Sequence, residues 1–275
     1  MSITLQQKEI FKKGSKTYFN SSRFFPSEVR ADVFILYAFV RVADDFVDSV
    51  PQDAKGFYDF KNSYALALSG TSSNNPVIDD FIELMHRRNF KPEWVDGFLH
   101  SMELDITKKE YNSLDETLEY IYGSAEVIGL FMVRLLNLPE ESFHAAQMLG
   151  RSMQYINFIR DVKEDYNLGR RYLPLNGTDL QSLSPEVCTE NPQTFADFIN
   201  AQTHLYQGWQ KEAEKGYRYI PKKLLVPIRT ASDMYNWTAA QIQKNPSIIW
   251  KKKVKPPKAL ILWTILINRI KRVPQ

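Results

Sequence analysis

Apolar residues recur at intervals of three and four along much of the chain, which is the spacing of amphipathic α-helices. The segments that show it are residues 33–48, 114–138, 148–166, 195–219 and 223–244. Prolines fall between these segments, as is typical of helix boundaries, and alternating runs typical of strands are few and short. The pattern predicts a single all-α domain over residues 1–275, with residues 68–76 as a flexible loop.

Charge and cysteine content exclude several classes of function. The 35 basic and 32 acidic residues nearly balance, which argues against a nucleic-acid partner. The one cysteine, Cys188, excludes an internal disulfide and favours a reducing, cytoplasmic compartment, and with four scattered histidines a zinc site is not expected. No signal-peptide run is seen, and the longest apolar stretch, residues 259–267, has about half the ~20 residues of a membrane-spanning helix. We therefore expect a protein that is soluble or bound to a membrane surface.

A polar stripe lies on the first predicted helix. At about 100° per residue, Tyr37, Arg41, Asp44 and Asp48 fall on one narrow face, whereas Asp45 lies farther round. The neighbouring positions are apolar, and burying carboxylates on such a helix is costly unless a cation compensates them. The stripe indicates a cation site, with a solvated acidic face as the alternative.

A second predicted helix repeats this arrangement. Asn157, Asp161 and Asp165 follow one another at intervals of four, so they share one face, and Glu164 is their neighbour. The rest of the helix is again apolar. Ion pairing at the surface with nearby lysine and arginine residues is the alternative explanation.

Two acidic helices together indicate metal-assisted diphosphate chemistry. Oxygen ligands without histidine or cysteine select a hard cation, and Mg²⁺ binds through a few carboxylates plus substrate phosphates; Mn²⁺ is the alternative ion. Such ions neutralise a departing diphosphate, which allows an allylic C–O bond to ionise. Arg41 and the pair Arg170-Arg171 suit the phosphate oxygens. The 17 Phe and 14 Tyr suit a cavity wall that shields a carbocation from water.

Four segments, in order along most of the chain, resemble the squalene/phytoene synthase family. Residues 14–19, followed by Phe24-Phe25-Pro26, resemble its N-terminal segment, and residues 36–48 resemble its first aspartate-rich motif. Residues 120–129 resemble its central Tyr-Gly-x-Ala-x-x-Val-Gly helix, although Glu126 stands where many members carry a small residue. Residues 154–174 resemble its second aspartate-rich motif and the loop after it.

The resemblance implies an all-α isoprenoid-synthase fold, a helical bundle around a central cavity. It implies that the Mg²⁺-diphosphate is bound by Asp44, Asp48, Asn157, Asp161 and Asp165. Diphosphate contacts are implied for Ser15, Tyr37, Arg41, Gln154 and Arg171. Tyr122 is expected near the reacting carbons, and Tyr235 on a late helix that closes the cavity.

The implied reaction joins two prenyl diphosphates head to head through a cyclopropylcarbinyl diphosphate. The Gly14 and Tyr120 segments look most like prokaryotic phytoene synthases, which favours two geranylgeranyl diphosphates giving phytoene. The alternative is a C15 substrate giving dehydrosqualene, or squalene if NADPH supplies hydride. If residues 15–25 are helical, Tyr18 and Ser22 share a face, and a small Ser22 on the wall of a substrate tunnel leaves room for a C20 chain. The alternative is that Ser22 is an ordinary surface serine. A non-catalytic assembly or binding relative is expected to have lost the metal aspartates, and a terpene cyclase is not expected to match both the 37–41 and 120–129 segments.

The C-terminal region is expected to touch a membrane surface. Trp250 precedes a basic block, an apolar run over residues 259–267 follows, and further basic residues close it. The basic residues are Lys251, Lys252, Lys253, Lys255, Arg269, Lys271 and Arg272. Such a composition suits the interface of an anionic bilayer. A terminal helix packed on the core, with solvated lysines, is the alternative.

Overall fold

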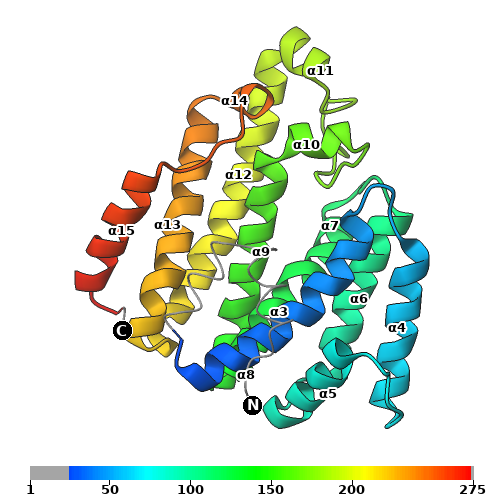
Figure 1. Ribbon diagram of the computed structural model, residues 1–275. Coiled ribbons are helices and arrows are strands. Elements are labelled where there is room, and N and C mark those ends of the chain that lie inside the picture. The colour runs from blue at the N-terminus through cyan, green and yellow to red at the C-terminus, as the bar shows by residue number, and fades with distance from the viewer. Residues whose placement is uncertain (1–24, 274–275) are drawn as a thin grey trace.

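The regular structure of residues 25–273, the part of the chain that the computed structural model describes, is helical (Figure 1). The α-helices are α3 (Ser27–Asp48), α4 (Ala54–Leu68), α5 (Pro76–Arg88), α6 (Pro92–Thr107), α7 (Leu114–Ile121), α8 (Val127–Leu135), α9 (Phe143–Arg160), α10 (Val162–Asn167), α11 (Pro185–Glu190), α12 (Pro192–Glu214), α13 (Lys222–Lys244), α14 (Ile248–Lys251) and α15 (Lys258–Ile270). A π-helical turn, η2 (Tyr122–Glu126), joins α7 to α8, and two 3₁₀ turns are η3 (Glu140–Ser142) and η4 (Lys215–Tyr219). In the described residues the β-type contact is an isolated bridge between Glu110 and Arg171. The all-α prediction is confirmed.

Helix boundaries follow the local chemistry of the sequence. α5 begins at Pro76, where the missing N–H costs nothing. The preceding Asn75 caps this helix by accepting a hydrogen bond from the backbone N–H of Val77 at 3.0 Å. The loop predicted over residues 68–76 is confirmed over residues 69–75, whereas Leu68 is the last residue of α4 and Pro76 the first of α5.

The helices pack around two hydrophobic clusters. One lies among α3, α4, α5, α6 and α8, where Phe39 stacks on Phe81 with 3.8 Å between ring centroids. The other lies among α9, α12, α13 and the loop after α10. Figure 1 shows α9, α12 and α13 side by side, with α15 on the outer side of α13. That these clusters form one domain over residues 1–275 stays a prediction.

The segment predicted as one helix over residues 114–138 contains the π-helical turn and ends at Leu135. Gly123 of this turn lies so close to α6 that a Cβ atom would overlap the carbonyl oxygen of Gly97 and the Oγ of Ser101. Ser101 Oγ donates to the carbonyl oxygen of Tyr120 at 2.8 Å. A π-helical turn contains an extra residue compared with an α-helical turn, and the spacing of apolar residues does not reveal it. The sequence pattern therefore did not predict η2.

The segment predicted as one helix over residues 148–166 is divided at Asp161, between α9 and α10. Asp161 has φ −100° and ψ 13°. Its backbone N–H still donates to the carbonyl of Asn157 at 2.8 Å, and its carbonyl accepts from the N–H of Asp165 at 2.9 Å. The three residues therefore keep the one-turn spacing that their sequence positions predict.

Glu126 is buried where η2 packs on α9, with 1% of its surface exposed. Its carboxylate accepts hydrogen bonds from Arg151 Nε at 2.6 Å and from Gln147 Nε2 at 3.3 Å. The Arg151 guanidinium lies 5.4 Å from the ring centroid of Trp209 in α12. The structure thus accounts for a glutamate at this position through an ion pair between helices.

Candidate active site

The C-terminal half of α3 carries the first predicted acidic set. Asp44 Oδ2 accepts from Arg41 Nη1 at 2.7 Å, and Arg41 also pairs with Asp45. Burial, reinforced by the charge of Asp48, raises the pKa of Asp44 to about 7. Tyr37 lies one turn before Arg41, and burial raises the pKa of its hydroxyl. This face of α3 therefore holds carboxylates where a further cation would stabilise their ionised form.

The second set, at the junction of α9 and α10, contains two carboxyl groups whose pKa values shift in opposite directions. Burial, followed by the charges of Asp161 and Glu164, raises the pKa of Asp165 to about 7. For Asp161 burial is outweighed by Arg160 and Lys253, which lower its pKa. Arg160 donates from Nε to Oδ1 of Asp161 at 2.8 Å and from Nη2 to Oδ2 at 2.5 Å. Ion pairing, the alternative explanation for this set, is thus present at Asp161.

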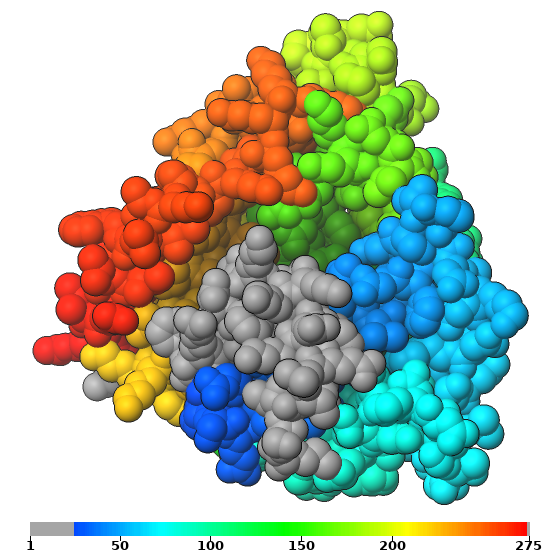
Figure 2. All heavy atoms as spheres, viewed as in Figure 1, coloured from blue at the N-terminus to red at the C-terminus, as the bar shows by residue number. Residues whose placement is uncertain are grey.

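Arg170 connects the two acidic sets. Its Nη1 lies 3.9 Å from Asp48 Oδ1, and its Nη2 donates to the carbonyl oxygen of Val47 at 3.4 Å. The backbone N–H of Arg170 donates to the carbonyl of Asp165 at 2.8 Å. Arg170 and Asp165 both line a pocket of about 190 Å³. Figure 2 shows the surface hollowed between α3, α9–α10 and α13–α14. The second set thus borders the pocket through Asp165, and Arg170 connects it to Asp48 at the end of α3.

The donor groups fit a divalent ion that shares its ligands with a phosphate. Within residues 25–273, no three acidic, histidine or cysteine side chains gather closely enough to hold an ion alone. Mg²⁺ commonly binds one or two carboxylates and completes its shell with substrate phosphates. The Oδ1 atom of Asn157 is buried and has no hydrogen-bond partner, so it can serve as a further oxygen ligand. The assignment of the five predicted metal ligands stays a prediction.

Arg171 is engaged in the loop between α6 and α7. Its Nη1 donates to the carbonyl oxygens of Tyr111 at 3.0 Å and Leu173 at 3.1 Å, and its Nη2 pairs with Glu110 at 2.8 Å. Its predicted contact with diphosphate stays a prediction. Arg170, its partner in the arginine pair, is the one that contacts the end of α3.

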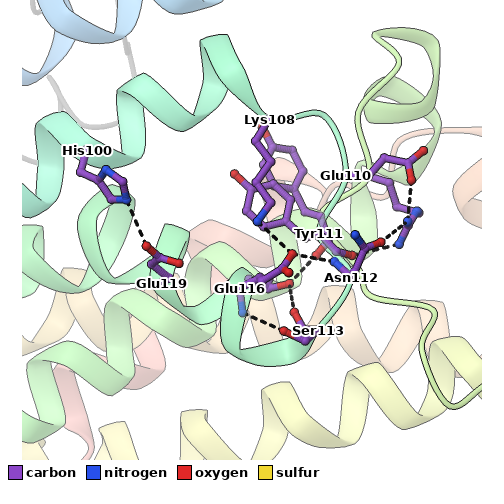
Figure 3. Close-up of polar contacts among 11 residues, drawn as sticks. His100, Lys108, Glu110, Tyr111, Asn112, Ser113, Glu116 and Glu119 are labelled. Atoms are coloured by element: carbon purple, nitrogen blue, oxygen red, sulfur yellow. Dashed lines mark hydrogen bonds and ion pairs between the residues drawn. The ribbon is translucent and has the colours of Figure 1, made fainter.

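The same loop is fixed by the start of α7 (Figure 3). Ser113 Oγ accepts from the N–H of Glu116 at 3.2 Å, and the Glu116 carboxylate accepts from the N–H of Asn112 at 2.9 Å. Lys108 Nζ lies 2.9 Å from the same carboxylate. This reciprocal capping satisfies N–H groups at the helix start and anchors the loop that holds Arg171.

The remaining predicted residues are distributed over three elements and the N-terminal segment. Tyr235 of α13 packs against the second hydrophobic cluster, and Gln154 is half-buried on α9. Tyr122 packs with the first hydrophobic cluster, its ring beside Gly97 of α6. Their roles stay predictions. Ser15, Tyr18 and Ser22 lie outside the described residues.

Asp105 of α6 is a buried carboxylate that the sequence analysis did not single out. It is 4% exposed and accepts from the hydroxyls of Tyr120 at 2.8 Å and Tyr172 at 2.7 Å. Gln52 Nε2 donates both to the carbonyl of Asp105 at 3.0 Å and to that of Val47 at 2.7 Å. This arrangement ties the end of α3 to α6. In the sequence, the one indication that Asp105 is buried is its position on the apolar face of a helix.

Comparisons with known proteins match most of the chain to one family. The profile of the family described as squalene/phytoene synthase matches residues 11–259. The 15-cis-phytoene synthase of Pantoea ananas is 25% identical over 256 residues, which cover 87% of this chain and 82% of that protein. The phytoene synthase of Cereibacter sphaeroides is 29% identical over 253 residues, 86% of this chain and 71% of that one.

Solved structures show the same fold. A dehydrosqualene synthase in complex with ligand has a TM-score of 0.80 at 20% identity, covering 96% of this chain and 94% of that chain. Squalene synthase HpnC from Alicyclobacillus acidocaldarius has a TM-score of 0.77 at 17% identity, covering 87% and 92%. The predicted isoprenoid-synthase-type bundle is confirmed.

Proposed function

The chain belongs to the squalene/phytoene synthase family, and we propose that it is a prenyltransferase that joins two geranylgeranyl diphosphates head to head to give 15-cis-phytoene. The proposed reaction passes through a cyclopropylcarbinyl diphosphate and depends on Mg²⁺. Relatives named 15-cis-phytoene synthase, matched over most of their length, support this product. The dehydrosqualene and squalene synthases are structural neighbours and leave a C15 substrate as the alternative.

The observation that carries the proposal is the pair of acidic sets connected by Arg170, each with a carboxyl group whose pKa is raised to about 7. At neutral pH, carboxyl groups in such surroundings are only partly ionised unless a cation joins them. Bound Mg²⁺ would supply that charge and neutralise the departing diphosphate. Asp44 and Asp48 would hold it from α3, and Asn157, Asp161 and Asp165 from α9 and α10.

Arginine side chains around the two sets are suited to bind the phosphate oxygens. Arg41 pairs with Asp44 at 2.7 Å, and Arg160 pairs with Asp161 at 2.5 Å. Arg170 contacts both Asp48 of α3 and Asp165 of α10. When the carboxylates bind metal, these guanidinium groups can donate to phosphate instead, with the two-pronged geometry that favours arginine. The family resemblance adds Ser15, Tyr37, Gln154 and Arg171 to the diphosphate contacts.

An assay with labelled C15 and C20 diphosphates, with Mg²⁺ and with or without NADPH, tests the function. We expect the C20 substrate to be converted to a conjugated triene without NADPH. Preference for the C15 substrate would establish the alternative product, and no turnover of either would favour a binding or assembly role. Ser22→Phe should lower the C20/C15 activity ratio if Ser22 lines the tunnel.

Substitution of the proposed ligands tests the site itself. Asp48→Ala and Asp161→Ala should abolish turnover while circular dichroism shows an intact fold. Asp48 belongs to a repulsive cluster, so its loss does not destabilise the protein, whereas loss of Asp161, which pairs with Arg160 and Lys253, should lower stability without unfolding it. Asp59→Asn is the matched control, since this exposed aspartate pairs with Lys55 along α4, away from both acidic sets. Near-normal activity in both alanine variants would remove the metal site from the proposal.

We also propose that the outer face of α15 contacts a membrane surface. Leu262, Trp263, Leu266 and Ile270 are 64%, 61%, 55% and 80% exposed. Basic residues flank this face on both sides in the sequence, and each near an anionic surface adds roughly 1 kcal/mol. No helix in residues 25–273 is both long enough and apolar enough to cross a bilayer. The proposed contact is therefore with one leaflet.

The inner face of α15 packs on the protein. Asn268 Nδ2 donates to Asp233 Oδ2 at 2.7 Å and to Thr230 Oγ1 at 3.2 Å, both on α13. Packing on the core, the alternative explanation of this segment, thus accounts for one side of the helix and leaves the apolar side exposed.

Co-sedimentation with anionic vesicles at low salt tests this contact. Changing Leu262, Trp263 and Leu266 to serine should reduce binding, and changing Lys251, Lys252 and Lys255 to glutamine should make it weaker and less sensitive to salt. The matched apolar control is Leu205→Ser, an exposed leucine on α12. Equal binding of all variants, or none by the unaltered protein, would refute the contact.

A further inference from the structure

The segment between α14 and α15 places a lysine on the second acidic set. Lys253 Nζ lies 3.0 Å from Asp161 Oδ1 and 3.4 Å from Glu164 Oε1. The side chains of Lys253 and Asp161 are 33% and 18% exposed, so water screens this pair only in part. Arg160 donates to both carboxylate oxygens of Asp161, so Oδ1 is shared between this guanidinium and the ammonium of Lys253.

The backbone beside Lys253 is held against α10. Val254 is 4% exposed and Ile249 is 1% exposed, and both belong to the second hydrophobic cluster. The ring of Trp250 meets that of Tyr166 edge to face, with 5.4 Å between centroids. Lys253 therefore stays within reach of the acidic set even when its ammonium leaves Asp161.

Lys253 differs in this from the other lysines of its block. Lys251, Lys252 and Lys255 are exposed, and within residues 25–273 no ion pair joins them to an acidic side chain. If these lysines only gave the surface a positive charge, Lys253 would not be expected to pair with the acidic set while its neighbours remain exposed. The contact indicates a specific role for Lys253 at the proposed site.

We infer that Lys253 competes with the metal ion for Asp161 and moves to a phosphate oxygen when a diphosphate binds. This inference rests on the proposed metal-diphosphate function. A divalent ion on Oδ1 of Asp161 would compete with the ammonium for that oxygen. With the ion alone, the ammonium loses Asp161 and keeps only its longer contact with Glu164, at 3.4 Å; with a diphosphate present, it gains a charge-assisted hydrogen bond in addition. Lys253 thus couples the binding of metal at the second set to the binding of diphosphate.

Lys253→Gln tests this with two binding measurements that need no turnover. Mn²⁺ binding without diphosphate, followed by electron paramagnetic resonance, should tighten about threefold because a partly exposed competing cation is gone. Inorganic pyrophosphate binding at saturating Mg²⁺, measured by calorimetry, should weaken about tenfold because a charged donor is lost. A purely structural role for Lys253 would weaken both.

Two further variants complete the design. Lys255→Gln makes the same change of charge two residues away and should alter neither affinity, and Lys253→Arg keeps the cation and should retain pyrophosphate binding. Unchanged affinities in Lys253→Gln, or shifts in the same direction, would overturn the inference while leaving the proposed function intact. Failure of the unaltered protein to bind Mn²⁺ or pyrophosphate would overturn the metal site, and the inference with it.

Discussion

Binding of metal should release protons near neutral pH, by an amount that two carboxyl groups determine. Burial holds the pKa of Asp44 and of Asp165 at about 7. A carboxyl group must lose its proton to bind a metal ion. Each group is therefore half protonated at pH 7, and filling both sets should release about one proton per protein there, about two at pH 6 and about 0.2 at pH 8.

The same protons weaken metal binding at acid pH. An ion that must displace a proton from a group with a pKa of about 7 loses about tenfold in apparent affinity between pH 8 and pH 6. Above pH 8 both groups are ionised, so the affinity should become independent of pH. An aspartate with an ordinary pKa would show this dependence only below about pH 4.

Calorimetric titration with Mn²⁺ in two buffers of different ionisation enthalpy measures the released protons directly. Asp44→Asn removes one of the two groups and should halve the release at pH 6.5, whereas Asp59→Asn, on an exposed aspartate, should leave it unchanged. Heats that do not depend on the buffer, or an affinity constant between pH 6 and pH 8, would refute the reasoning.

The remaining predictions concern stability. In protein stripped of metal, the raised pKa values make the folded state retain protons that the unfolded chain has lost between about pH 4 and pH 7, so the melting temperature should fall as pH rises across that window; a rise would contradict the assignment. Gly123→Ala should cost more than about 2 kcal/mol in chemical denaturation because its Cβ would overlap α6, whereas Gly208→Ala, which has open space, should be neutral or stabilising. Arg151→Ala leaves Glu126 buried without its cation and should cost about 3 kcal/mol, and adding Glu126→Gln should recover part of the loss; additive costs would show that the pair is not coupled.

The positions of the acidic sets could be predicted because helical register is a local property. Four-residue spacing placed Asp44 with Asp48 and Asp161 with Asp165 on common faces, and even the break at Asp161 preserved the spacing through backbone hydrogen bonds. The cations that neutralise these groups could not be predicted in the same way. Lys253 reaches Asp161 only because α14 docks on α10, a contact that no spacing rule contains.

Adjacent residues in a loop set a further limit on sequence analysis. Arg170 and Arg171 are equivalent as a motif, yet Arg170 contacts α3 and Arg171 is held by the loop after α6. Gly169, with φ 66°, turns the chain just before them. The direction of each side chain then depends on that turn and on the bridge between Glu110 and Arg171, which are tertiary features.

The first acidic set also lies at a helix end where carboxylates are ordinarily unfavourable. α3 ends at Asp48, whereas Asp161 both ends α9 and begins α10, so the opposite helix ends offset one another there. The aligned peptide dipoles give the end of α3 the equivalent of roughly half a negative charge, which repels an acid and attracts a cation. The dipole of α3 therefore adds to the attraction that Asp44 and Asp48 would exert on a metal ion, without any further side chain. Placing acids at this end has a cost in stability, and a bound cation would remove it.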